Sequence, residues 1–164
     1  MRSAFDDWVA TLGGSVSPEA RAFLCHVFDE HGPVSSEEAG RIGHDHQLAL
    51  TQEAVARVAR DIATTTTVDP PPFEFRDENG SIRVAFWGRY ATTPISGLTQ
   101  AAVTVEVADF MQGEVMEDLH RVWPKCDDHG VGLHPSLSSE RAVWMCRTGA
   151  HAVARIGQFR PQSA

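Results

Sequence analysis

The 164-residue sequence has few cysteines, no long apolar run and no excess of positive charge. Three cysteines are an odd number and too sparse for the disulfide framework of a small secreted protein. No apolar stretch approaches the roughly 18 residues that a membrane-spanning helix needs. Acidic residues stand near the N-terminus, where a secretory signal would be apolar. These features predict a soluble, cytoplasmic protein without a membrane-spanning segment.

Acidic residues outnumber basic residues by 22 to 14, which gives a formal net charge of −8. Most of the excess lies in the first 69 residues, and no stretch of the chain is basic. A partner held mainly through its phosphate groups, such as a nucleic acid, is therefore disfavoured. Apolar residues make up 42% of the chain, which is enough to bury a core in one domain or two very small ones.

Apolar residues at helical spacing indicate helices in the first half of the chain, over residues 5–12, 18–30, 35–42 and 47–63. The capping-box pair Ser35 and Glu38 is a typical helix start, and Gly43 is expected to end the third helix. Later, apolar and polar side chains alternate on either side of Asn79-Gly80. That dipeptide predicts a two-stranded β-hairpin over about residues 73–87.

Three helices followed by a two-stranded ribbon is also the element order of a winged helix-turn-helix domain. Residues 31–39 resemble the segment that opens the second helix in many bacterial domains of this kind, and the resemblance covers residues 17–90. It implies a DNA-binding surface in which positive side chains of the last helix and of the ribbon contact phosphates, namely Arg57, Arg60, Arg83 and Arg89.

The charge of this half opposes that role. Glu53 and Asp61 cancel the two positive charges of the helix over residues 47–63, and the half as a whole is acidic. Winged-helix folds also serve as protein-contact modules, because a fold does not fix a function. We therefore favour a scaffold role and keep a DNA-binding regulator as an alternative.

An amphipathic helix and a second hairpin are expected in the rest of the chain. Apolar residues from Val103 to Val122 share one helical face, which predicts a single helix over residues 98–122. Residues 142–156 alternate around Thr148-Gly149, and this pattern is typical of a β-hairpin.

Two cysteines and three histidines gather in the last 40 residues. Cys126-x2-His129 and Cys146-x4-His151 are separated by sixteen residues, a two-plus-two arrangement with the spacing of a zinc knuckle. Each pair lies across an expected turn, and the hairpin brings the two pairs together. Cys₂His₂ is a ligand set of structural zinc. The longer gap in the second pair leaves His134 as an alternative to His151.

Residues 123–159 resemble the tail of a group of small, uncharacterised bacterial proteins. That tail carries Trp-Pro-x-Cys-x-x-His, then a Trp-x-Cys hairpin that closes on Ile-Gly, matched here by residues 123–129, 144–146 and 156–157. The resemblance implies a zinc-ribbon-like fold and metal binding, and it implies no reaction. Many of those tails carry proline after each cysteine, where this chain has Asp127 and Arg147.

The sequence therefore predicts an α+β protein of two units. Residues 1–97 form a helical, winged-helix-like unit with a hairpin, and residues 98–164 form an amphipathic helix followed by a zinc-knuckle hairpin. We expect a zinc-stabilised accessory or interaction protein whose partner is a protein or a small molecule. A zinc-dependent enzyme with an open metal position, with Cys126, Cys146 and one histidine as ligands, stays as an alternative. The oligomeric state does not follow from the sequence.

Two aromatic residues are candidates for a small-molecule site. Trp87 and Tyr90 follow the first expected hairpin and would form the floor of a cleft between the two halves of the chain. Core packing is the ordinary role of such residues.

Overall fold

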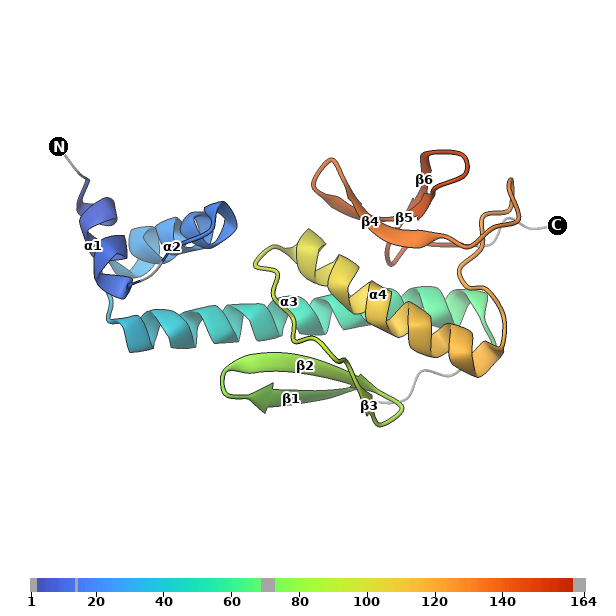
Figure 1. Cartoon of the computed structure of the whole chain (residues 1–164), viewed down its shortest axis with the longest axis horizontal. Coiled ribbons are helices and arrows are strands. Elements are labelled where there is room, and N and C mark those ends of the chain that lie inside the picture. Colours follow the sequence, from blue (N-terminus) through green and yellow to red (C-terminus); the bar gives the residue numbers. More distant parts are fainter. Residues whose placement is uncertain (1–2, 14, 69–72, 161–164) are drawn as a thin grey trace.

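The computed structural model describes residues 3–13, 15–68 and 73–160, and it is an α+β structure built along one long helix, α3 (Ser36–Thr65). Helices α1 (Ala4–Leu12) and α2 (Pro18–His31) lie over the N-terminal end of α3, and α4 (Gln100–Leu119) crosses its other half (Figure 1). Two small antiparallel sheets flank the pair formed by α3 and α4. No helix in the described ranges is long and apolar enough to cross a membrane.

Helix α3 corrects the expectation of two helices over residues 35–42 and 47–63. The chain stays helical through Gly43, so the expected break is wrong. A glycine inside a helix costs only about 1 kcal/mol relative to alanine, and contacts with the rest of the molecule outweigh that cost. The ring of His46 lies 4.9 Å from that of Phe23, and its Nε2 lies 3.2 Å from the carbonyl oxygen of Leu98.

The helices begin where the sequence offers hydroxyl caps. Ser35 Oγ accepts a hydrogen bond from Glu38 N at 3.2 Å, as its capping role predicts. The Glu38 carboxylate does not complete the box, because it pairs with Arg41. Helix α4 is shorter than expected, since His120 adopts a left-handed conformation directly after Leu119.

The first sheet has the strand order β1-β2-β3, with β1 at Glu74–Glu78, β2 at Ser81–Phe86 and β3 at Arg89–Tyr90. Asn79 and Gly80 both have positive φ (56° and 80°), which is the geometry of the two-residue turn that the sequence predicts. The hairpin is therefore confirmed, and β3 is an addition to it.

The second sheet has the order β4-β5-β6, with β4 at His134–Ser138, β5 at Arg141–Cys146 and β6 at His151–Arg155. The hairpin predicted over residues 142–156 corresponds to β5 and β6. Strand β4 was not predicted from the sequence, and its presence makes β5 the central strand.

Two hydrophobic clusters stabilise the fold. The larger one includes residues from both sides of position 97, among them Val58 of α3, Phe86 of β2, Met111 of α4 and Trp144 of β5. The smaller one lies between α1, α2 and the start of α3 and has four buried members, Trp8, Val9, Val27 and Ala39. The division of the chain into units at residue 97 stays a prediction.

Candidate metal centre

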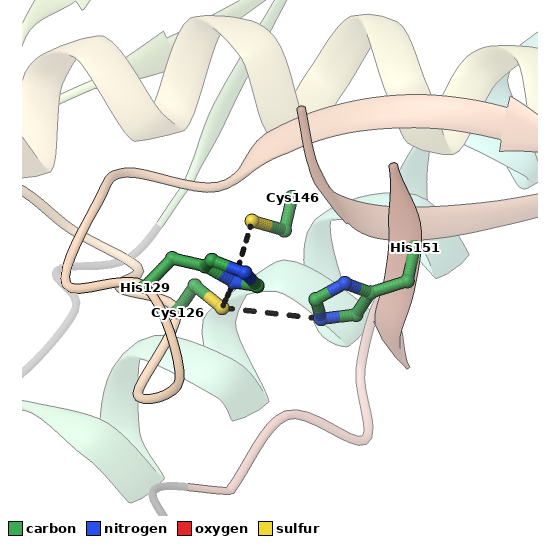
Figure 2. Close-up of side chains that lie close together, drawn as sticks. All are labelled: Cys126, His129, Cys146 and His151. Carbon is green, nitrogen blue, oxygen red and sulfur yellow. Dashed lines mark hydrogen bonds between the residues drawn. The ribbon is translucent and has the colours of Figure 1, made fainter. Parts of the chain in front are cut away.

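Four side chains with metal-binding atoms converge at one end of the second sheet (Figure 2). Cys126 and His129 lie in the loop between α4 and β4, Cys146 is the last residue of β5, and His151 is the first residue of β6. Cys146 and His151 are direct cross-strand partners, so the pairing of β5 with β6 brings them together. The four ligand atoms all lie within 4.8 Å of one another.

The distances between these atoms fit a tetrahedral metal site. His129 Nδ1 lies 3.5 Å from Cys126 Sγ and 3.6 Å from Cys146 Sγ, and His151 Nε2 lies 3.9 Å from Cys126 Sγ. Bonds of about 2.3 Å from zinc to sulfur and about 2.0–2.1 Å from zinc to nitrogen give sulfur–nitrogen edges of about 3.6 Å in a tetrahedron. The donor set and its spacing therefore suit a tetrahedral metal ion.

Backbone hydrogen bonds shape the loop that carries the first pair of ligands. Cys126 N donates to Val131 O at 2.8 Å, and Gly130 N donates to Cys126 O at 2.8 Å. Gly130 has a φ of 66°, which glycine adopts without strain. The loop thus folds back on Cys126 and brings His129 beside its sulfur.

The second pair of ligands depends on Gly149, in the turn between β5 and β6. Gly149 N lies 3.5 Å from Cys146 Sγ, as an N–H donor to sulfur. A Cβ atom at this position would lie 2.5 Å from His129 Cε1 and 2.5 Å from His151 Nδ1. Only glycine lets both imidazole rings approach the turn so closely.

The cluster is buried on its sulfur side and open on its histidine side. Cys126 and Cys146 are 1% and 0% exposed, whereas His129 is exposed and His151 is half-buried. Asp128 Oδ2 lies 4.0 Å from His151 Nε2. Both cysteines are free thiols in the structure. A metal ion at this position would therefore bind at the edge of the core, within reach of solvent.

A buried carboxylate supports the sheet that carries the cluster. Asp61 of α3 accepts hydrogen bonds from Trp144 Nε1 at 2.8 Å, Gly157 N at 2.7 Å and Phe159 N at 2.9 Å. Burial raises the pKa of Asp61, and these three donors offset part of that shift. Asp61 ties β5 and the segment after β6 to α3.

An amide supports the loop that carries Cys126 and His129 in the same way. The side chain of Gln112 in α4 donates to the carbonyl oxygens of Trp123 and Leu133, at 2.9 and 2.6 Å. These two residues lie on either side of Cys126 and His129 in the sequence. Gln112 thus fixes both ends of the loop on α4.

The two candidate histidines lie in different surroundings. His134 lies in β4 opposite Met145 and is not a member of the four-residue group, which contains His151 instead. The sequence left both histidines open, because the choice depends on the cross-strand register of β5 and β6. Asp61, Gln112 and Gly149 were missed as supporting residues, because helical Asp and Gln are ordinarily solvent-exposed and turn glycines are common.

The two aromatic candidates make contacts within and beside the first sheet. The ring of Trp87 lies 4.1 Å from that of Phe86, and Tyr90 Oη donates to Glu74 Oε2 at 3.0 Å. The guanidinium of Arg76 lies over the Tyr90 ring at 4.5 Å. A ligand site at Trp87 and Tyr90 stays a prediction.

The four arginines that were candidates for DNA binding all have partners within the protein. Arg57 pairs with Glu53 at 3.0 Å, and Arg60 donates to Gly157 O at 3.3 Å. Arg83 pairs with a glutamate of β1 and donates to backbone carbonyls, and Arg89 pairs with two glutamates of α4.

Comparisons of the chain with protein-family models, with curated proteins and with solved structures found no match. The chemistry of the site must therefore be inferred from its own geometry.

Proposed function

We propose that this chain is a cytoplasmic zinc-binding accessory or interaction protein, in which a closed Cys₂His₂ site stabilises the C-terminal sheet. The observation that carries the proposal is the convergence of Cys126, His129, Cys146 and His151, with sulfur–nitrogen distances close to those of a zinc tetrahedron. Two thiolates with two imidazoles favour zinc over magnesium and calcium, which prefer oxygen ligands. The resemblance of residues 123–159 to zinc-ribbon-like bacterial tails supports the same metal.

A closed site favours a structural role for the metal. Catalytic zinc commonly has three protein ligands and leaves one position for water or substrate. Here four side chains offer ligand atoms at comparable distances, so they would fill a tetrahedron. The zinc-dependent enzyme remains the alternative, in which one histidine is replaced by water and Asp128 is the neighbouring carboxylate.

A protein partner fits the surface of the same region. Strand β4 is an edge of its sheet, and its Leu137 side chain is 56% exposed. An edge strand with an exposed apolar side chain is a common site of protein contact. The DNA-binding regulator is disfavoured, because the net charge is −8 and the four candidate arginines pair with groups of the protein itself.

The test is the metal content of the purified protein combined with thermal melts in the presence and absence of a chelator. We expect one zinc per chain and a large fall in melting temperature when the metal is removed. Cys126→Ser should lose the zinc, whereas Cys25→Ser, at an exposed cysteine of α2, should retain it. Likewise His151→Ala should weaken zinc binding and His134→Ala should not.

The outcomes separate the candidates. Protein that contains no zinc after purification and binds none when zinc is added contradicts the proposal. Loss of a measured activity on chelation, with no change in melting temperature, favours the enzyme. An equal effect of His134→Ala and His151→Ala would mean that the fourth ligand has been assigned wrongly.

A further inference from the structure

A second site candidate lies away from the metal cluster, in a cleft of about 450 Å³. Four parts of the chain form it: the middle of α3, the first turn of α4, the start of β5 with the turn before it, and the end of β6 with the segment that follows it. Its charged lining residues are four arginines and two glutamates, Arg57, Arg60, Arg141, Arg155, Glu53 and Glu140.

The charge of this cleft contrasts with that of the whole chain. The lining carries two more positive than negative side chains, in a protein whose net charge is −8. Arg57 pairs with Glu53, and Arg60 donates to a backbone carbonyl. Within the part of the chain that the structure describes, the side chains of Arg141 and Arg155 have no ion pair or hydrogen bond. Two guanidinium groups at the cleft are thus available to a ligand.

The arginines are brought together by a rigid part of the fold. Gly157 packs so closely on α3 that a Cβ atom there would lie 2.9 Å from Arg57 Cβ. Asp61 accepts a hydrogen bond from Gly157 N, and Arg60 donates one to Gly157 O. The segment that follows Arg155 is therefore fixed beside the arginines of α3, almost 100 residues away in sequence.

The start of α4 adds to the positive potential of the cleft. Gln100 and Ala101, the first two residues of the helix, line it. The first turn of α4 carries no acidic side chain of its own, so the positive end of the helix dipole adds to the potential of the cleft.

We propose that this cleft binds a small molecule that carries a phosphate group. A phosphate monoester has a charge of about −1.5 to −2 at pH 7, which matches the two surplus positive charges of the lining. Its oxygens accept bidentate hydrogen bonds from more than one guanidinium, whereas a single carboxylate is satisfied by one. The volume suits a small organic ligand.

The proposed phosphate site lies away from the Cys/His cluster. Arg141 and Cys146 are at opposite ends of β5, and five steps along a strand span about 17 Å. Binding to the metal-loaded chain therefore tests the cleft without involving the candidate metal ligands, and the phosphate proposal can fail while the zinc proposal holds.

Isothermal titration of the metal-loaded full chain at low ionic strength tests the proposal, with phenyl phosphate as the probe and phthalate as a dianion without phosphate. We expect phenyl phosphate to bind at one site per chain, about tenfold or more tighter than phthalate. The variant Arg141→Gln/Arg155→Gln should weaken phenyl phosphate binding by roughly tenfold or more. Arg76→Gln removes the same kind of charge from β1 of the other sheet and should leave the affinity unchanged.

Three results overturn the proposal: no saturable binding of phenyl phosphate, equal affinity for phthalate, or equal losses in the cleft variant and in Arg76→Gln. Tighter binding of a short DNA duplex, lost in the same cleft variant, would mean that the surface serves nucleic acid instead. The exposed positions of Arg141 and Arg155 make a folding defect easy to check by thermal melt, and each single variant provides a second measurement.

Discussion

The N-terminal helical region and the C-terminal region of this protein are stabilised in different ways. The first, formed by α1, α2 and the start of α3, has a core of four buried apolar residues, and the rings of Phe5 and Phe28 pack against one of them, Trp8. The second, formed by α4 and the sheet β4-β5-β6, combines apolar packing with buried polar side chains and a Cys/His cluster.

The two regions differ in how far their stability depends on single chemical groups. Apolar contacts are numerous and interchangeable, so the loss of one side chain costs a moderate amount of free energy. A metal ion or a buried carboxylate that binds several segments at once has no substitute nearby. We therefore expect the C-terminal region to respond sharply to specific changes and the N-terminal region to respond gradually.

Metal removal should have the largest effect. Because structural zinc contributes its binding free energy to folding, chelation is expected to destabilise the C-terminal region by several kcal/mol, on the order of 5 or more. Hydrogen exchange of backbone amides should show loss of protection in β5 and β6 and little change in α1 and α2. Equal loss of protection in both regions would contradict a local role of the metal.

Asp61→Ala should have the next largest effect. It leaves the N–H groups of Trp144, Gly157 and Phe159 without their acceptor in a buried site, which should lower the free energy of unfolding by about 3 kcal/mol. The matched control is Asp109→Ala, at an exposed aspartate of α4, which should change it by less than about 0.5 kcal/mol. Urea unfolding of the zinc-loaded protein measures the free energy of unfolding of both variants. Similar values for Asp61→Ala and Asp109→Ala would contradict the proposed role of Asp61.

Gly149→Ala should weaken metal binding more than it affects folding of the rest of the chain. The added methyl group would meet the rings of His129 and His151 and push them apart, so we expect at least about a tenfold loss of zinc affinity, or 1.4 kcal/mol. Gly113→Ala, in α4, meets no atom within 4 Å and is the control. Competition with a coloured zinc chelator measures the zinc affinity of both variants. An unchanged zinc affinity in Gly149→Ala would show that the turn does not need glycine.

Val27→Ala should have the smallest effect on zinc binding. Val27 is 2% exposed in the small N-terminal cluster, and truncation removes two methyl groups, which costs about 1–2 kcal/mol. Zinc affinity should stay the same as in the wild type. A change in zinc affinity would mean that the two regions are coupled through α3, contrary to the contrast drawn between them.

The sequence predicted those features whose cause is local. Asn79-Gly80 revealed the first hairpin because its residue types suit positive φ. The turn that joins β4 to β5 also has two residues with positive φ, but they are Ser139 and Glu140, which carry no such preference. The turn before β5 therefore gave no sequence signal, and strand β4 was not predicted.

Other differences have causes that lie far away in the chain. Gly43 does not end a helix, because contacts of the neighbouring turns with α2 and with the loop before α4 keep α3 intact. The cysteine and histidine spacing identified the five candidate ligands, but the choice of His151 over His134 depends on the cross-strand register of β5 and β6. Asp61 finds its partners 83 to 98 positions later in the sequence, a distance that no local pattern records.

X-ray absorption spectroscopy of the zinc-loaded protein reports the ligand atoms of the metal directly. We expect a first coordination shell of two sulfur atoms at about 2.3 Å and two nitrogen atoms at about 2.0–2.1 Å. Cys146→Ser should leave one sulfur in that shell, and Cys25→Ser should leave both. A shell with only nitrogen and oxygen, or one that is unchanged in Cys146→Ser, would contradict a Cys₂His₂ site formed by Cys126, His129, Cys146 and His151.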